Sequence, residues 1–281
     1  MRQALSTYLP RLARTISGTG LTRLPGIKRL APKSFLVEAD GFSVYVDPRD
    51  QGISRDLIFG AGYEPEETRL LEKVLRPGMT FVDIGANIGY FTLVGARAVG
   101  STGRVIAFEP TPSAFRLLTK NIAANGFAQV AAFPNAVTNR NASATLFLDA
   151  RSPVHSSVSE ANIGESAGSV TVETVSLDTF LPSIEIDRVD VVKIDAQGAE
   201  LQILEGGEQT LAHPSVVVIL EFWPPGLLGL GASPEELLRR VQALGFSIHI
   251  LEDDLAPAGP EDVLRRYEQG DLDALNLVLQ R

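Results

Sequence analysis

Short apolar strands and amphipathic helices alternate through the middle of this 281-residue chain, and this rhythm constrains the fold more than any other feature. Such alternation favours right-handed crossovers, and hence a mainly parallel sheet with helices on its faces. The expected strands are Thr80–Ile84, Arg104–Phe108, Val130–Phe133, Val189–Ile194, Val216–Glu221, Phe246–Leu251 and Ala274–Leu279. The main expected helices are Ile88–Val99, Pro112–Asn125 and Glu200–Leu211. The sequence therefore predicts an α/β fold with a seven-stranded, mostly parallel sheet and flanking helices.

A basic segment and a hairpin pattern precede this alternation. Residues 1–36 carry seven basic side chains and no acidic one, although the formal net charge of the chain is −9. We expect residues 1–34 to form a basic extension, which is a poorly packed chain end, an organelle transit peptide or an arm that contacts anionic membrane lipid. Phe35–Ala39 and Phe42–Val46 flank Asp40-Gly41, which predicts a β-hairpin. We expect residues 35–281 to form a single domain.

Composition excludes several classes of function. The chain has no cysteine, so disulfides, a cysteine nucleophile and thiolate metal sites are excluded. The chain beyond residue 36 contains all 34 acidic side chains and only 18 basic ones, and this negative balance disfavours nucleic acid as a partner. The sequence contains no run of about 18 apolar residues, so it predicts no membrane-spanning helix. We expect a cytoplasmic protein, and the basic N-terminus offers a means of peripheral contact with a membrane.

The turn between the strand at 80–84 and the following helix carries a glycine pattern. It reads Asp83-Ile84-Gly85-Ala86-Asn87-Ile88-Gly89, with the spacing D-x-G-x-x-x-G. Glycines at such a turn let a ligand approach the backbone, and the helix N-terminus favours an anionic group. A dinucleotide pattern would need glycine at 87 and 90, where the chain has Asn87 and Tyr90. Glu109 follows the next strand, where a carboxylate can accept both ribose hydroxyls of a nucleoside.

These residues belong to a set of four stretches that resembles FkbM-type methyltransferases. The stretches are Gly62–Pro65, Asp83–Gly89, Phe108–Pro110 with Lys120-Asn121, and Val192–Glu200, joined by Leu204–Gly206 and Glu221. The resemblance implies a class I methyltransferase (Rossmann-like) fold and S-adenosyl-L-methionine as the cofactor. It also implies methylation of a hydroxyl group on a sugar, glycan or secondary metabolite. Gln197 departs from the family, which usually has glutamate at that position.

The resemblance further implies a cofactor site. The residues from Asp83 to Gly89 would surround the homocysteine part of the cofactor, and Glu109 would bind its ribose. Asn135 could contact adenine but is equally a turn residue. Glu64 could bind the cofactor's ammonium group but is equally an acid that opens the next helix. The expected cofactor-binding residues are Glu64, Asp83, Gly85, Ala86, Asn87, Gly89, Glu109, Pro110, Asn135 and Ala136.

A hydroxyl acceptor has to lose a proton, and His155 and Asp195 are the expected catalytic residues. His155 lies in the polar segment Asp149–Gly168, so a base role there depends on an ordered loop. Asp195 ends the fourth strand, at the edge where ligands bind in open α/β sheets. We expect Asp195 to position substrate or metal and rank it above His155, because the sheet holds a strand-end carboxylate in place.

A metal ion is a second route to the same proton loss. Asp195, Glu200 and Glu221 could converge on Mg²⁺, although Glu200 is equally a favourable acid in the first turn of a helix. Gln197 and Trp223 are the expected substrate contacts. Trp223 lies in an apolar segment that either covers the site or packs against the sheet edge.

Two functions follow from the sequence. The first is an S-adenosylmethionine-dependent O-methyltransferase that acts on a small-molecule or glycan acceptor. The alternative is a catalytically silent fold that binds a nucleoside, or that serves as a membrane or partner adaptor through its basic N-terminus. The intact glycine turn and Glu109 favour the first.

Overall fold

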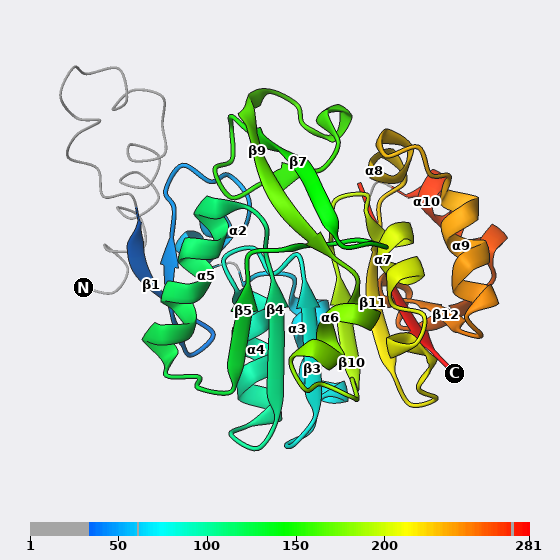
Figure 1. Cartoon of the computed structure of the whole chain (residues 1–281), viewed down its shortest axis with the longest axis horizontal. Coiled ribbons are helices and arrows are strands. Elements are labelled where there is room, and N and C mark those ends of the chain that lie inside the picture. Colours follow the sequence, from blue (N-terminus) through cyan, green and yellow to red (C-terminus); the bar gives the residue numbers. More distant parts are fainter. Residues whose placement is uncertain (1–33, 61, 271–272) are drawn as a thin grey trace, which may run out of the picture.

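The computed structural model describes residues 34–60, 62–270 and 273–281. Its centre is a sheet with the strand order β13-β12-β14-β11-β10-β3-β4-β5 (Figure 1). Five neighbouring strands are parallel: β11 (Val217–Phe222), β10 (Val191–Ile194), β3 (Thr80–Ile84), β4 (Arg104–Phe108) and β5 (Val130–Phe133). Beyond them β14 (Leu275–Gln280) is antiparallel to both β11 and β12 (Ser247–Ile250). The predicted α/β fold is therefore confirmed.

The sheet has one strand more than the sequence predicted. This eighth strand, β13 (Ala256–Ala258), pairs antiparallel with β12 at the edge of the sheet. Its three residues are too few for an alternating pattern, and Pro257 is tolerated at an edge, where no further strand needs its missing N–H. The seven predicted strands are all present.

Helices cover both faces of the sheet because successive strand residues point to opposite sides. Phe81 of β3 packs in a buried cluster with α2 (Ile53–Phe59), α3 (Pro65–Val74), α4 (Tyr90–Val99) and α5 (Pro112–Asn125). Val82, the next residue, packs in a second cluster with α6 (Leu177–Ser183), α7 (Glu200–Gly206), α9 (Pro234–Ala243) and α10 (Pro260–Gln269). The core therefore lies in two layers, one on each side of the sheet.

A second, four-stranded sheet occupies the segment where the alternation breaks. Its order is β6-β9-β7-β8, with β6 (Ala136–Val137), β7 (Ala142–Asp149), β8 (Ser156–Ser157) and β9 (Ser166–Val175). The chain enters β6 two residues after β5 ends, so this sheet begins at the carboxyl edge of the central sheet, where β7 and β9 are seen in Figure 1. The predicted polar loop is therefore partly strand, and a short connection with His155 remains between β7 and β8.

The predicted hairpin is confirmed as β1 (Phe35–Ala39) and β2 (Phe42–Val46). The expected basic extension lies outside the described residues, apart from Ser34. The short helices α2, α6 and α8 (Pro224–Gly229) were not predicted, because six or seven residues give too few turns for a helical period. No helix in the described ranges is long and apolar enough to cross a membrane.

Candidate active site

A cavity of about 310 Å³ lies at the carboxyl ends of the parallel strands. Ile84, Phe108, Asp195 and Glu221 contribute to its wall from the ends of β3, β4, β10 and β11. The connection from β2 to α3 and the connection from β7 to β8 close it from the other side. This is the edge at which open α/β sheets bind ligands.

The glycine turn forms part of the cavity wall. Gly85 has φ +80°, and a Cβ there would overlap the carbonyl oxygen of Asp195, so this position requires glycine. The amides of Gly85 and Ala86 both donate to the carbonyl oxygen of Phe108, each at 3.0 Å. Asn87 follows with φ +51°, and its Oδ1 atom is buried with no hydrogen-bond partner in the described part of the chain. The turn thus leaves a polar atom for a ligand.

Glu109 accepts two short hydrogen bonds, one of which comes from this turn. Its Oε2 accepts from the amide of Asn87 at 2.8 Å, and its Oε1 accepts from the amide of Thr111 at 2.7 Å. Burial raises the pKa of Glu109 to about 7, although these donors favour the charged form. The carboxylate is therefore fixed in the cavity wall and close to its titration point at neutral pH.

The other predicted cofactor residues divide into two groups. Glu64, Pro110, Asn135 and Ala136 line the cavity, and burial followed by repulsion from Glu67 raises the pKa of Glu64 to about 8. Asp83, Ala86 and Gly89 are not among the lining residues.

Asp83 and Gly89, which belong to the second group, stabilise the turn from outside the cavity. The carboxylate of Asp83 accepts from Thr92 Oγ1 at 2.5 Å, and burial raises its pKa to about 6. Gly89 has φ +95°, precedes α4 and lies against Leu118. The expectation that all of these positions surround the cofactor is corrected accordingly.

A buried lysine lies behind the cavity. Lys193 is 4% exposed, and its Nζ lies 3.2 Å from Asp195 Oδ2 and 3.5 Å from Glu67 Oε2. It also stands 4.6 Å from the centre of the Phe91 ring. Burial opposes its charge, but Glu67 and Asp195 raise the pKa of Lys193 well above its ordinary value. This cation is therefore engaged by protein groups on all sides.

Asp195 and Glu221 form an acidic pair bridged by Gln197. The Nε2 atom of Gln197 donates to Asp195 Oδ1 at 3.1 Å and to Glu221 Oε2 at 3.4 Å. Burial would raise the pKa of Asp195, but Lys193 and these hydrogen bonds lower it below the ordinary value. Burial and the charge of Asp195 raise the pKa of Glu221 well above the ordinary value. Of the two, Asp195 is thus the stronger acid and Glu221 the weaker.

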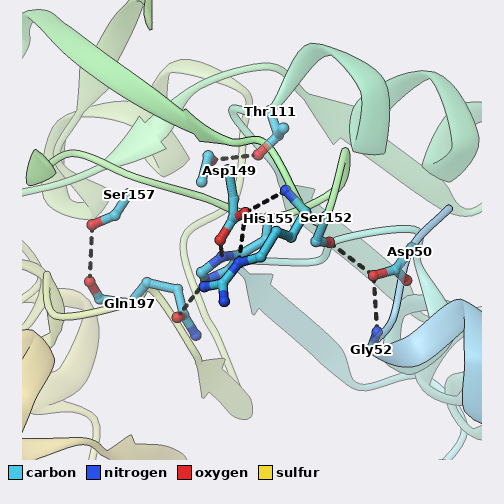
Figure 2. A network of polar contacts seen from close by, with 10 residues as sticks. Asp50, Gly52, Thr111, Asp149, Ser152, His155, Ser157 and Gln197 are labelled. Carbon is cyan, nitrogen blue, oxygen red and sulfur yellow. Dashed lines mark hydrogen bonds and ion pairs between the residues drawn. The ribbon is translucent and has the colours of Figure 1, made fainter. Parts of the chain in front are cut away.

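His155 lies in the cavity between two acceptor oxygens (Figure 2). Its Nε2 is 2.9 Å from Oε1 of Gln197, and its Nδ1 is 3.5 Å from Oδ2 of Asp149. Burial raises the pKa of Asp149, but the Arg151 amide and His155 outweigh it, so the pKa of Asp149 is lowered. The buried carboxylate orients one edge of the imidazole ring, and the other edge faces the cavity.

Side-chain hydroxyls tie the connection that carries His155 to neighbouring elements (Figure 2). Ser152 donates to Asp50 at 2.8 Å, Ser157 donates to the carbonyl oxygen of Gln197 at 3.2 Å, and Thr111 and Ser156 share a hydrogen bond of 2.6 Å. His155 ranked second among the expected catalytic residues because it lies on a loop. Because these contacts hold the loop in place, its loop position no longer argues against a catalytic role of His155.

The expected metal site is not assembled. In the ranges that the structure covers, no three His, Asp or Glu side chains are grouped so that they could hold a metal ion. Glu200 is fully buried, and its Oε1 accepts from the amides of Ala196 and Gly198, each at 3.1 Å. It supports the turn after β10 as an acid at the start of α7. The residues present therefore do not fit Mg²⁺.

Trp223 does not line the cavity either. Its ring lies against Gly226 in its own helical turn. Asp149 and the pairing of Lys193 were not predicted from the sequence. The alternation of β10 could have revealed the latter, since Lys193 and Asp195 are two residues apart on one strand face. Nothing in the sequence around Asp149 indicated its contact with His155.

Comparisons with known proteins find methyltransferases similar to this chain. Methyltransferase sdnD of Sordaria araneosa is 28% identical over 201 residues, covering 59% of this chain and 73% of that protein. Hexuronic acid methyltransferase AglP of Haloferax volcanii is 28% identical over 156 residues, covering 56% of this chain and 61% of that protein. The solved structure of Methyltransferase FkbM from Methylobacillus flagellatus aligns with a TM-score of 0.43 at 14% identity, over 80% of this chain and 52% of its own.

The Methyltransferase FkbM domain matches residues 83–248, from the glycine turn to β12. This range includes the turn, Glu109, His155, Asp195 and Glu221, and it spans more than half of the chain. The chain therefore belongs to the FkbM methyltransferase family.

Proposed function

We propose that this protein is an S-adenosylmethionine-dependent O-methyltransferase that methylates a hydroxyl group of a sugar, glycan or secondary metabolite. One observation carries the proposal: the same cavity contains the Gly85 turn with Glu109 and an imidazole, His155, oriented by a carboxylate. Family membership supports methyl transfer, and the name of the AglP relative supports a sugar as one class of acceptor. The silent adaptor is not favoured, because the Gly85 turn, Glu109 and the oriented imidazole of His155 share one cavity.

The residues at the turn fit the cofactor. The buried Oδ1 of Asn87 lacks a donor among the described residues, and the hydroxyls or ammonium group of the cofactor could provide one. Glu109 would accept hydrogen bonds from the ribose, Asn135 and Ala136 would flank the adenine, and Glu64 would face the ammonium group. When bound, S-adenosylmethionine supplies the methyl group, whose carbon–sulfur bond breaks as the acceptor oxygen bonds to the carbon.

His155 is the base in this proposal. The acceptor hydroxyl takes the place of the Gln197 oxygen at Nε2, and its proton passes to that nitrogen. Asp149 accepts the hydrogen bond from Nδ1–H, which leaves Nε2 free to take the proton and stabilises the resulting cation. Asp149 acts through His155 and is therefore a positioning residue.

Asp195 is a weaker choice of base, although its place at a strand end ranked it first from the sequence. Its pKa is lowered, and its oxygens already accept from Lys193 and Gln197. A carboxylate so stabilised has little tendency to take a proton from a hydroxyl. Positioning of the substrate, through Gln197, remains the role that its contacts support.

We also propose that residues 35–281 act as one methyltransferase domain.

Two measurements test the proposed function. Calorimetry on cofactor-free protein should show binding of S-adenosylmethionine and S-adenosylhomocysteine. Methyl-labelled cofactor should then label members of a panel of sugars, glycosides and hydroxylated metabolites. Absence of cofactor binding at millimolar ligand would refute the assignment. Binding without any labelling of hydroxyl acceptors would instead support the silent alternative.

A further inference from the structure

The cavity wall is rich in acids and poor in cations. Five carboxyl groups line it, of which Glu64 and Glu109 face the cofactor in the proposed binding mode, which leaves Asp50, Asp195 and Glu221 for the acceptor. No lysine or arginine is among the lining residues in the described part of the chain. Apart from the charge that the cofactor brings, the protein wall therefore offers an acceptor many hydrogen-bond acceptors but no permanent positive charge.

The buried lysine does not change this balance. Lys193 stands behind Asp195, 4% exposed, and Asp195, Glu67 and the Phe91 ring surround its ammonium group. An anion in the cavity would have to displace one of these carboxylates to reach it. Its charge is therefore used to keep Asp195 ionised and is not available to a ligand.

Several hydroxyl groups of the wall are already hydrogen-bonded. Ser152 donates to Asp50, Ser157 donates to the Gln197 carbonyl, and Thr111 and Ser156 bond to each other. The amide nitrogen of Gln197 donates to Asp195 and Glu221. A ligand carboxylate or phosphate would find few free donors, whereas a hydroxyl or ammonium group brings donors of its own.

We propose that the methyl acceptor is a neutral polyol or an amino sugar, and that the part of it that enters the cavity carries no carboxylate or phosphate. This inference rests on the proposed methyltransferase function and names its substrate class. Two costs act against an anionic acceptor. Its charge meets that of Asp195, whose counter-ion Lys193 is buried and out of the acceptor's reach, and its oxygens remain short of donors. An ammonium group instead pairs with Asp195 and eases the ionisation of Glu221, whose pKa burial and the charge of Asp195 raise.

A matched set of ligands tests the inference. Methyl glucopyranoside, its 2-amino-2-deoxy counterpart and methyl glucuronopyranoside share one ring and differ in a single group. Their dissociation constants would be measured by nuclear magnetic resonance titration of protein saturated with S-adenosylhomocysteine, near neutral pH. We expect the amino sugar to bind at least as tightly as the neutral glycoside, and the uronate to bind about tenfold or more weakly than either.

Two variants connect the order of affinities to the cavity wall. Glu221→Gln keeps the shape of the side chain but cannot ionise. It should therefore reduce the difference in affinity between the amino sugar and the uronate. Glu205→Gln, on the exposed surface of α7, should leave the gap unchanged. If the difference in affinity between the two sugars is equal in wild type and both variants, the charge of Glu221 is not its origin.

The outcomes separate the two proposals. Uronate binding as tight as that of the neutral glycoside would overturn the inferred acceptor class. Failure of all three sugars to bind to protein that does bind S-adenosylhomocysteine would overturn it as well, while leaving the methyltransferase assignment in place. Failure of S-adenosylhomocysteine to bind would refute the proposed function itself.

Discussion

The Nε2 atom of His155 lies 2.9 Å from Oε1 of Gln197, on the side of the ring opposite Asp149. The amide nitrogen of Gln197 donates to the acidic pair Asp195 and Glu221, which leaves its oxygen to face the imidazole. His155 is therefore connected to the strand-end carboxylates through one side chain. An acceptor hydroxyl at Nε2 would lie at the junction of the loop and the sheet.

Replacement of His155 tests its role as base. We expect His155→Ala to lower turnover by about 10²–10⁴-fold, because the acceptor hydroxyl loses its proton acceptor. Affinity for S-adenosylhomocysteine should stay close to wild type, since the turn and Glu109 are untouched. Initial rates at saturating cofactor, with calorimetry in parallel, measure the two effects. A variant with wild-type turnover would remove His155 from the chemistry.

Asp149→Asn tests the positioning role without removing the side chain. The amide oxygen can still accept from the Arg151 amide, as Asp149 Oδ1 does at 2.7 Å, so the local turn should persist. An amide is a poorer partner for a cationic imidazole, so we expect kcat to fall by about 10- to 100-fold. The KM values for cofactor and acceptor should change little. A rise in KM at unchanged kcat would indicate a purely structural role.

The sequence predicted the scaffold of the site better than its chemistry. Gly85 and Glu109 were found because a strand-to-helix turn and a strand-end acid have fixed places in a parallel sheet. The contact of His155 with Asp149 was not found, because it joins the end of β7 to a loop whose path depends on hydroxyl contacts with distant elements. The metal set failed for a related reason. Glu200 shares the sheet edge with Asp195, yet its oxygen is used by backbone amides.

Cofactor affinity should depend on the ionisation of Glu109. Burial raises the pKa of this group to about 7, and ribose hydroxyls donate more strongly to the charged form. Affinity for S-adenosylhomocysteine should therefore rise as pH increases through about 7. Glu109→Gln should weaken binding by about 1.5–3 kcal/mol and flatten this dependence. Calorimetry at several pH values checks both effects, and an unchanged affinity would show that the ribose lies elsewhere.

Gly85→Ala tests the close approach of the turn to β10. The added Cβ combines a positive φ with overlap on the Asp195 carbonyl oxygen, so we expect a loss of about 3 kcal/mol or more in the free energy of unfolding. Gly126→Ala is the matched control, because Gly126 has φ +69° and a Cβ added there would meet no atom within 4 Å. It should lose only about 1 kcal/mol. Equal losses in urea melts would mean that the close approach does not constrain the turn.

Glu200 should make the cofactor-free protein less stable as pH rises. Its side chain is fully buried, and burial raises its pKa from 4.5 to about 7 despite amide donors from Ala196 and Gly198. The folded state therefore holds this proton more tightly than the unfolded state does. The resulting stabilisation is complete below about pH 4.5 and is lost as pH rises through about 7, to an extent on the order of 3 kcal/mol.

Glu200→Gln isolates this contribution. The amide oxygen can still accept from the turn, but the side chain cannot ionise, so the variant should lose less stability than wild type between mildly acidic and mildly alkaline pH. Any cost of burying the amide nitrogen is the same at every pH, and it shifts the curve without changing its slope. Urea melts of cofactor-free wild type and variant across this range measure the two slopes. Parallel curves would show that Glu200 does not change its protonation over this range, and a steeper curve for the variant would reverse the assigned sign.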